Sequence, residues 1–333
     1  MNRFWQLDAY PQGTDFASGI ALAEEPVPQI EDGQLLVRNL WLSLDAGTRM
    51  WLTPRTDSYM DPTPLGSKIV GFVLAQVVES RHAGFKPGDI VRAYGQWADY
   101  SVLYPAMGDI WVVPQIEDMR QHFAVLGPNG WTAYVGLNEY GRVHPGETVL
   151  VSAAAGATGL LAAQFARQMG CRVIGIAGGP QKCAMLTNDY GLAAAIDYKH
   201  DDVGGALARI APDGIDCYFD CVGGPMLDAV LPNMAMNGRV AICGLISTYD
   251  SEERVGPKNF DLILMKRLTV AGFFSPDFYF RGEEINRLTR PWLESGAVGM
   301  PFDETQGLEN TLTAYGKLFS GGNIGKVMVR LTV

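Results

Sequence analysis

The fold of this 333-residue chain is decided by the stretch Thr148-Val149-Leu150-Val151-Ser152-Ala153-Ala154-Ala155-Gly156-Ala157-Thr158-Gly159. Its apolar first half, residues 148–153, predicts a strand, and the small residues after it predict a turn that opens a helix running to Met169. Such a turn lets backbone N–H groups approach a pyrophosphate at the positive end of the helix. Gly156 would permit that approach, and Gly159 would let the helix pack closely on the strand. The stretch therefore predicts a dinucleotide-binding strand–turn–helix unit.

The turn departs from the usual glycine fingerprint at one position. Ala153 stands where the first glycine is expected, which weakens the motif. Small-residue turns between a strand and a helix also occur for packing alone, so the motif by itself leaves that alternative open. The surrounding sequence favours the cofactor interpretation, because further apolar strands alternate with helical or loop stretches. These expected strands are 172–177, 194–197, 216–219, 240–243 and 268–273.

The chain is expected to form two domains. Continuous apolar strands that alternate with helices predict a parallel sheet covered on both faces. Before about residue 125 the strands are short and broken by Gly and Pro turns, as at 35–44 and 69–78, which suggests a small barrel or sandwich. The end of the chain, 325–333, predicts a strand that returns to the first domain. The expected domains are 1–125 together with 291–333, and 126–290.

Charge and composition exclude several kinds of partner. A formal net charge of −10 argues against nucleic acid and against an anionic membrane surface. The N-terminal residues lack the apolar run of a secretory signal, and no stretch approaches the roughly 20 apolar residues of a membrane span. We therefore expect a cytoplasmic protein.

The five cysteines fall in apolar strand-like or helical surroundings, and their number is odd. Buried free thiols in a reducing cytoplasm are the natural interpretation. A zinc site is the competing one, but the chain has no C-x-x-C pair. Cys217 and Cys221 also share one short apolar run without a nearby histidine. No bound metal is expected.

The segment after the second strand indicates which dinucleotide binds. An NAD site usually places Asp or Glu about 20 residues after the turn, where the carboxylate accepts a hydrogen bond from the ribose 2′-OH. The corresponding residues here, 173–182, contain no acid. Gly178 and Gly179 leave room instead, and Lys182 can pair with a 2′-phosphate, so NADPH is the expected cofactor. The alternative for Lys182 is a solvated lysine in the first turn of a helix.

A longer series of motifs resembles the medium-chain dehydrogenase/reductase superfamily. Within it, the chain is similar to the zinc-independent leukotriene/prostaglandin reductases, plant double-bond reductases and bacterial curcumin reductases. The resemblance covers most of the chain, is strongest over residues 130–249, and keeps the family's order of motifs. The matching stretches are 130–134, 145–149, 152–159, 178–179 with Lys182, 195–199, 216–220, 223–224, 240–249 and 322–326.

The resemblance implies a fold and a set of site residues. The fold is a Rossmann doubly wound parallel sheet plus a GroES-like β-barrel domain, with NADPH in the cleft and homodimers joined through the Rossmann sheets. Lys182 and Tyr198 would hold the 2′-phosphate, and Asn323 would reach the nicotinamide from the last segment of the chain. Tyr249 matches a tyrosine placed near the nicotinamide and the substrate carbonyl. The implied cofactor-binding residues are Ala155, Gly156, Ala157, Thr158, Gly159, Gly179, Lys182, Tyr198, Cys221, Cys243, Gly244, Tyr249 and Asn323.

The chain departs from the family pattern at two places. The family usually carries Asp-Pro-Tyr-Met-Arg in its first domain, whereas this chain has Asp45-Ala46-Gly47-Thr48-Arg49. A tyrosine that lines the substrate site is therefore Gly47 here, and the shape of the substrate does not carry over. Cys221 replaces the asparagine of Asp-Asn-Val-Gly-Gly, which removes an amide expected near the cofactor.

The missing zinc ligands narrow the expected chemistry. Alcohol oxidation would lose its Lewis acid. Reduction of an activated C=C bond needs hydride delivery to the β-carbon of an enone and hydrogen-bond donors for the developing enolate oxygen. Tyr249 and the nicotinamide ribose 2′-OH are the candidate donors, and the α-carbon proton could come from solvent. We expect an NADPH-dependent reductase of α,β-unsaturated ketones or aldehydes, with Tyr249 as oxyanion donor rather than obligatory acid.

Several alternatives stay open from the sequence. Related zinc-free proteins also pass hydride to quinones, so an NADPH:quinone oxidoreductase is one. A non-catalytic NADPH-binding sensor is another, because Gly47 alters the first-domain motif. Tyr249 could instead close a loop after a strand, and Asn323 could be a turn residue.

Apolar residues, most of them aromatic, could wall a pocket for a small apolar substrate, but aromatic clusters more often belong to a core or a dimer interface. The candidates are Trp51, Tyr59, Met60, Phe273, Phe274, Phe278, Tyr279 and Phe280.

Overall fold

The structure is a computed structural model that describes residues 1–56, 60–108, 110–249 and 256–331. Tyr59, named above as a candidate pocket residue, lies outside the described residues. Packing divides the chain into two compact units. Unit 1 combines Met1–Phe123 with Phe302–Val333, and unit 2 is Ala124–Pro301.

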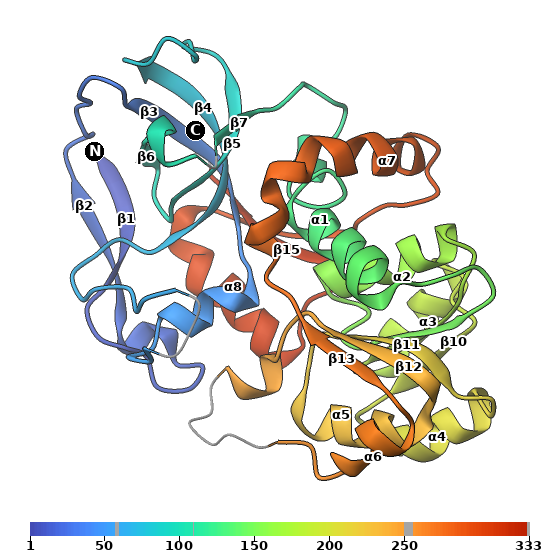
Figure 1. Cartoon of the computed structure of the whole chain (residues 1–333). Coiled ribbons are helices and arrows are strands. Elements are labelled where there is room, and N and C mark those ends of the chain that lie inside the picture. Colours follow the sequence, from blue (N-terminus) through green and yellow to red (C-terminus); the bar gives the residue numbers. More distant parts are fainter. Residues whose placement is uncertain (57–59, 109, 250–255, 332–333) are drawn as a thin grey trace. The chain divides into compact units, whose positions relative to one another are not determined.

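Unit 2 is built on a six-stranded sheet in which neighbouring strands are parallel. Its strand order is β10-β9-β8-β11-β12-β13 (Figure 1). This is the doubly wound order 3-2-1-4-5-6, in which the direction of winding reverses between β8 and β11. The expected Rossmann fold is therefore confirmed. The strands are β8 (Thr148–Val151), β9 (Arg172–Ala177), β10 (Ala194–Asp197), β11 (Ile215–Asp220), β12 (Met234–Ile242) and β13 (Thr269–Gly272).

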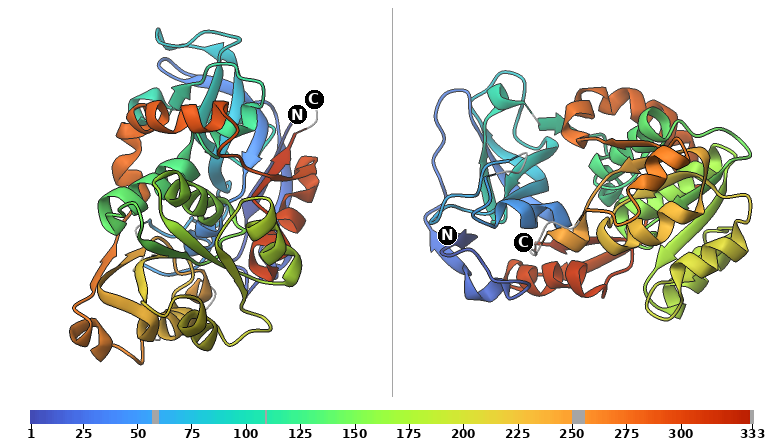
Figure 2. Two further views of the ribbon diagram at one scale, coloured as in Figure 1. Left: turned by 90° about the vertical axis from the view of Figure 1, so that its right-hand side faces the viewer. Right: turned by 60° about the horizontal axis from the view of Figure 1, so that its bottom comes forward.

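Helices cover both faces of this sheet (Figures 1 and 2). One core cluster packs Leu150 of β8 and Ile174 of β9 against Leu207 and Leu227, which lie on two of these helices. Near-continuous apolar strands are typical of a parallel sheet buried on both faces. The helices are α1 (Pro128–Val135), α2 (Ala157–Gln168), α3 (Pro180–Asn188), α4 (Val203–Ile210), α5 (Gly224–Val230), α6 (Asp261–Met265) and α7 (Gly282–Glu294).

Unit 1 contains a mostly antiparallel sheet of order β14-β15-β3-β4-β5-β7, with β6 also paired to β3. Only β14 and β15 pair in parallel in this described sheet. The blue N-terminal and red C-terminal segments lie side by side in Figure 2, because β15 pairs with β3. The expected GroES-like domain is thus confirmed. The strands of this sheet are β3 (Leu35–Ser43), β4 (Val70–Ser80), β5 (Ile90–Gln96), β6 (Tyr100–Leu103), β7 (Ile110–Val112), β14 (Phe302–Gln306) and β15 (Lys326–Arg330), with helix α8 (Thr311–Ser320) between β14 and β15 in the chain. Strands β1 (Asn2–Leu7) and β2 (Ile20–Glu25) pair antiparallel in a separate sheet of unit 1.

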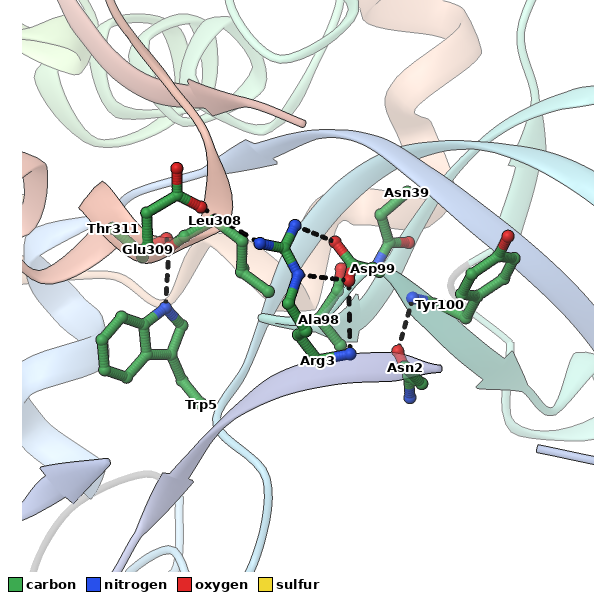
Figure 3. A network of polar contacts seen from close by, with 10 residues as sticks. All are labelled: Asn2, Arg3, Trp5, Asn39, Ala98, Asp99, Tyr100, Leu308, Glu309 and Thr311. Atoms are coloured by element: carbon green, nitrogen blue, oxygen red, sulfur yellow. Dashed lines mark hydrogen bonds and ion pairs between the residues drawn. The ribbon is translucent and has the colours of Figure 1, made fainter. Parts of the chain in front are cut away.

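Polar contacts tie strand β1 to distant parts of unit 1 (Figure 3). The Arg3 guanidinium donates to both carboxylate oxygens of Asp99, at 2.9 and 3.1 Å, and to Glu309 at 3.2 Å. The Trp5 indole N–H donates to the Leu308 carbonyl oxygen at 2.9 Å. Because Leu308 and Glu309 belong to the C-terminal segment, the first and last parts of the chain close this unit together.

The structure differs from the sequence expectation at one domain boundary. The boundary expected after residue 290 falls inside helix α7. This helix packs on α1, and unit 2 consequently extends to Pro301.

The aromatic segment 273–280 packs largely within unit 2. Phe273 stacks on Tyr140 with ring centroids 4.8 Å apart, and Phe278 meets the same tyrosine edge-on at 6.0 Å. Tyr279 meets the Trp131 ring of α1 at 5.4 Å. Phe280, by contrast, is 83% exposed. Most of this segment therefore packs within unit 2, which agrees with the alternative that these aromatic residues belong to a core.

Candidate cofactor site

The candidate site lies at the carboxyl edge of the unit 2 sheet. In an open parallel sheet, ligands bind outside the carboxyl ends of the strands, at the point where the winding reverses. That point lies here between β8 and β11, which pair directly. The turns after β8, β9, β11 and β12 all meet this edge, and they contain most of the residues expected to bind the cofactor.

The turn after β8 is tightly held against helix α2. Ala153 adopts a left-handed backbone conformation with φ +48°, at the position where the fingerprint has its first glycine. A Cβ atom at Gly159 would lie 2.3 Å from the Ala153 carbonyl oxygen, so only glycine fits there. The helix can therefore start directly at the turn, with Gly156 as its N-cap residue in extended conformation. This brings the backbone N–H groups of the first helical turn to the sheet edge.

Asp220, the last residue of β11, fastens two turns of the site together. Its Oδ1 atom accepts hydrogen bonds from the Val222 and Gly223 backbone N–H groups, both at 2.9 Å. The same atom accepts from the Ser152 hydroxyl at 3.2 Å and the Tyr218 hydroxyl at 2.8 Å. Ser152 lies in the turn after β8, so Asp220 joins that turn to the turn after β11.

The Asp220 side chain is fully buried, and burial raises the pKa of its carboxyl although the four hydrogen bonds oppose this. Its Oδ2 atom is buried without a hydrogen-bond partner among the described residues. A buried polar atom without a partner is costly. Such strain at a sheet edge is typical of functional sites, where the surrounding structure maintains it.

A second cluster of site residues gathers at the ends of β9 and β10. The Asp197 Oδ1 atom accepts from the Gly179 N–H at 2.7 Å and from the Lys199 N–H at 3.1 Å. These backbone bonds, the Gly179 bond above all, lower the pKa of Asp197. Gly179 has φ +103°, a conformation that favours glycine. The loop that leads into α3 is therefore fixed in position by Asp197.

Two lysines and a tyrosine surround this loop. A Cβ atom at Gly178 would lie 2.8 Å from the Tyr198 ring and 3.0 Å from Cε of Lys199, so both side chains use the space that this glycine leaves. Burial and, after it, repulsion by Lys199 lower the pKa of Lys182. Two ammonium groups that repel each other gain from an anion between them. The sequence prediction for Lys182 and Tyr198 thus coincides with a cationic patch.

The turn after β12 carries the remaining expected residues of this unit. Cys243 follows β12 directly, and its N–H donates to the Asp220 carbonyl oxygen at 2.8 Å. The Tyr249 hydroxyl oxygen accepts from the Leu245 N–H at 3.3 Å. It also lies 3.1 Å from the place of a Cβ atom on Gly244. The structure therefore brings Tyr249 back against the Cys243–Gly244 stretch.

Three residues named in the sequence analysis, Asn323, Asp45 and Arg49, belong to unit 1. Asn323 is buried, and its side-chain N–H donates to the Gly325 carbonyl oxygen at 3.1 Å, as a turn residue would. Its role toward the nicotinamide stays a prediction. Asp45 forms an ion pair with the buried Lys326 of β15. Arg49 donates to the carbonyl oxygens of Leu52 and Pro11, and so ties the segment 49–52 to the loop that contains Pro11.

The structure adds several residues to the site that the sequence did not predict. Ser152 and Asp220 fasten the turns, Asp197 fixes Gly179, and Lys199 adds a second cation. Asp220 and Asp197 each end an apolar strand, and that position was the available signal. Their partners lie 68 and 18 positions away along the chain.

Among the described residues, no group of three or more His, Cys, Asp or Glu side chains could hold a metal ion. No helix in the described part of the chain has the length and apolar character needed to cross a membrane.

Comparison with known proteins gives consistent matches over the whole chain. Residues 3–109 match a family described as N-terminal domain of oxidoreductase, and residues 157–290 one described as zinc-binding dehydrogenase. The chain is 38% identical to the NADP(+)-dependent 2-alkenal reductase of Nicotiana tabacum, over 98% of this chain and 95% of that protein. It is 36% identical to the NADPH-dependent curcumin reductase of Escherichia coli, over 99% and 97%. The crystal structure of CurA in complex with NADPH from Vibrio vulnificus is similar at a TM-score of 0.92, with 34% identity and 99% of both chains covered.

Proposed function

The chain belongs to the zinc-independent group of the medium-chain dehydrogenase/reductase family, and on that premise we propose that it reduces the C=C bond of α,β-unsaturated ketones or aldehydes with NADPH. Its relatives are NADPH-dependent reductases of this kind, and a structure similar over the whole chain contains NADPH. It is accordingly an NADP-dependent oxidoreductase that acts on C=C bonds.

The observation that carries the cofactor assignment is the cationic patch beside Gly179. Lys182 and Lys199 repel each other in the absence of an anion, and Asp197 is engaged with backbone N–H groups. A 2′-phosphate would relieve the repulsion, whereas a bare 2′-OH would meet no carboxylate in residues 173–182, where an NAD site carries one. We assign the 2′-phosphate to Lys182 and Tyr198, and the pyrophosphate to the backbone from Ala155 to Thr158 with Gly159 supporting the turn.

Bound NADPH supplies the hydride that goes to the β-carbon of the substrate. The protein's task is then to hold the substrate carbonyl and to stabilise the negative charge that develops on its oxygen. Tyr249 is our candidate donor, because its hydroxyl lies against Gly244. The hydrogen bond from the Leu245 N–H uses a lone pair of the Tyr249 hydroxyl oxygen. Donation to the substrate oxygen would use the hydroxyl proton instead. Cys221, Cys243 and Gly244 are proposed to line the nicotinamide end of the site in unit 2, and the assignment of Asn323 to the nicotinamide is kept as a separate proposal from the sequence.

An activity panel tests this proposal against its alternatives. NADPH oxidation is followed with an alkenal, an enone and a quinone as acceptors, and the organic product is identified. We expect the saturated carbonyl compound from the first two. Turnover of the quinone alone would favour a quinone oxidoreductase. Tight NADPH binding without turnover of any acceptor, and with Tyr249→Phe unchanged, would favour a sensor.

The 2′-phosphate assignment has its own test. We expect Lys182→Ala to weaken NADPH binding roughly ten- to a hundredfold, because a charge-assisted hydrogen bond contributes about 1.5–3 kcal/mol. NADH, which lacks the phosphate, should bind with nearly unchanged affinity. Lys86→Ala, at an exposed position of unit 1, serves as control. An unchanged NADPH/NADH preference in Lys182→Ala would show that the assignment is wrong.

A homodimer is part of the same proposal. β13 ends the sheet order and pairs with β12 alone among the described strands. An edge strand presents unpaired N–H and C=O groups that can pair with another chain. Val270 on this strand is 36% exposed, and Leu264 of α6 is 74% exposed. Sedimentation of the wild type and of Val270→Asp tests the proposed dimer. We expect the wild type to sediment as a dimer and Val270→Asp as a monomer, and a monomeric wild type would overturn the proposal.

A further inference from the structure

Two cysteines meet at the carboxyl edge of the unit 2 sheet. Asp220 of β11 and Ile242 of β12 are paired in register, and the next residue of each chain segment is Cys221 and Cys243. The Cys243 N–H donates to the Asp220 carbonyl oxygen, which holds the two segments together past the ends of the strands. The two side chains interact, because the neighbouring Cys243 thiol raises the pKa of the Cys221 thiol. Both residues are partly exposed.

This pair differs from the other cysteines of the chain. Cys171 and Cys217 are buried, and burial raises the pKa of their thiols to about 11 and about 12. Cys183 is partly exposed, but burial and, after it, the carboxylates of Asp197 and Asp201 raise the pKa of its thiol and oppose thiolate formation. All five cysteines lie in the described part of the chain. Among them, only Cys221 and Cys243 combine a neighbouring sulfur atom with exposure to solvent.

We propose that Cys221 and Cys243 form a reversible disulfide, closed by hydroperoxides and opened by thiol reductants, that weakens cofactor binding. In the first step one sulfur attacks a peroxide oxygen and the O–O bond breaks, giving a sulfenic acid and the alcohol of the hydroperoxide, or water where the oxidant is hydrogen peroxide. In the second step the other thiol displaces hydroxide from that sulfur, and the hydroxide takes up the thiol proton, giving the disulfide and water. The two sulfurs together lose two electrons, which reduce the O–O bond. The interaction with Cys243 and, after it, burial raise the pKa of the Cys221 thiol, so Cys221 keeps its proton and acts second.

The location connects the disulfide to the cofactor, a connection that rests on the proposed function. A disulfide bond is about 2.05 Å long, much shorter than a hydrogen bond between sulfur atoms. Closure therefore draws the segments after β11 and β12 together. Gly244 packs on the backbone of Cys221, since a Cβ atom on this glycine would lie 3.5 Å from the Cys221 carbonyl oxygen. The turn that carries Gly244 and Tyr249 must move with the sulfurs.

Oxidation of the full chain with hydrogen peroxide tests the proposal. We expect the loss of two titratable thiols, a Cys221–Cys243 linked peptide in non-reducing mass spectrometry, and recovery with dithiothreitol. Cys183→Ser should behave like the wild type, and Cys221→Ser should give no linked peptide. A linked peptide containing another cysteine, or a sulfinic acid at Cys243 as main product in folded protein, would overturn the proposal.

Redox equilibration separates this proposal from the proposed function. In glutathione buffers we expect a midpoint potential about 30 mV more positive with saturating NADP⁺, the equivalent of a tenfold weaker binding to the oxidised form. An unshifted potential, with NADP⁺ bound, would overturn the link to the cofactor. Failure of the C=C reduction leaves both readouts intact, because neither depends on turnover.

Discussion

Ala153 carries a backbone conformation that L-residues other than Asn and Asp rarely adopt. The left-handed region costs a residue with a Cβ atom roughly 1–2 kcal/mol, and Ala153 has φ +48°. Its side chain is partly exposed, so little packing is lost on its removal. We expect Ala153→Gly to raise the free energy of unfolding by about 0.5–1 kcal/mol in urea denaturation. Ala154→Gly, at a fully buried position, should lower it, and equal effects of the two variants would refute the strain at Ala153.

Gly159 is the residue on which the close approach of helix and turn depends. A Cβ atom there would lie 2.3 Å from the Ala153 carbonyl oxygen and 3.1 Å from that of Ser152, and backbone atoms cannot move aside easily. We expect Gly159→Ala to lower the free energy of unfolding by about 2–3 kcal/mol and to weaken NADPH binding. Gly316→Ala is the matched control, since Gly316 lies in helix α8 with open space around its Cβ position. That variant should be neutral or more stable by up to about 1 kcal/mol.

Elements of unit 2 are tied across the sheet by a charge pair. Glu147, just before β8, accepts from Arg239 of β12 through both carboxylate oxygens, one of them at 3.0 Å. Arg239 also donates to the Gly141 carbonyl oxygen at 2.8 Å. Since β11 lies between β8 and β12 in the sheet, the pair bridges over the start of that strand.

This pair predicts a pH dependence of stability. Burial alone would raise the pKa of Glu147, but the bonds from Arg239 and the His144 N–H outweigh it, so the pKa is lowered. A lowered pKa contributes stability that is present above the ordinary value and lost as the pH falls through the folded-state value. We expect Glu147→Gln to cost about 1–2 kcal/mol at pH 7, and the difference from wild type to shrink below about pH 4.5. Urea denaturation measures both; Glu31→Gln, on the surface, should show no such trend.

The bounds of the strands show which elements could be predicted from the sequence. Strand β9 has the bounds that the sequence predicts, 172–177, because residues 173–177 are continuously apolar. Strand β12 begins earlier than predicted, since Asn237 at φ +60° and Gly238 break the apolar pattern. Strand β14 was not predicted, because its sequence Phe-Asp-Glu-Thr-Gln is polar and it forms by pairing with β15. Pairing partners far along the chain leave no local signal.

The cofactor site, like the strands, was only partly predictable from the sequence. Lys182 and the small-residue turn could be predicted, because residue type and spacing alone indicate a phosphate. The contacts from Asp220 to Ser152 and from Asp197 to Gly179 could not, because they join residues that only the sheet brings together. A single sequence without the sheet order does not tell which strand ends are neighbours. The role of Cys221 beside Cys243 depends on that order as well.

At the scale of the whole molecule, unit 1 is assembled from both ends of the chain. β15 pairs with β3 and β14 extends the sheet beyond it. The core of this unit includes Tyr315 and Val327 from the C-terminal segment, both fully buried. Tyr315 packs against Phe16 at 4.7 Å and Trp97 at 5.2 Å between ring centroids. Without the C-terminal segment, these aromatic residues would face water and β3 would lose its neighbour.

Unit 2, in contrast, is one continuous segment with its own sheet and core. We therefore expect residues 124–301 expressed alone to unfold cooperatively on heating, and residues 1–123 alone to show no cooperative transition. Adding residues 302–333 through a flexible linker should restore the transition, because burial of strands β14 and β15 and helix α8 supplies apolar area that the shorter fragment lacks. Calorimetry of the three fragments measures this. A cooperative transition of residues 1–123 alone would mean that β3 and its neighbours form a stable sheet before the end of the chain is present, and that the C-terminal segment is an addition rather than a part of the core.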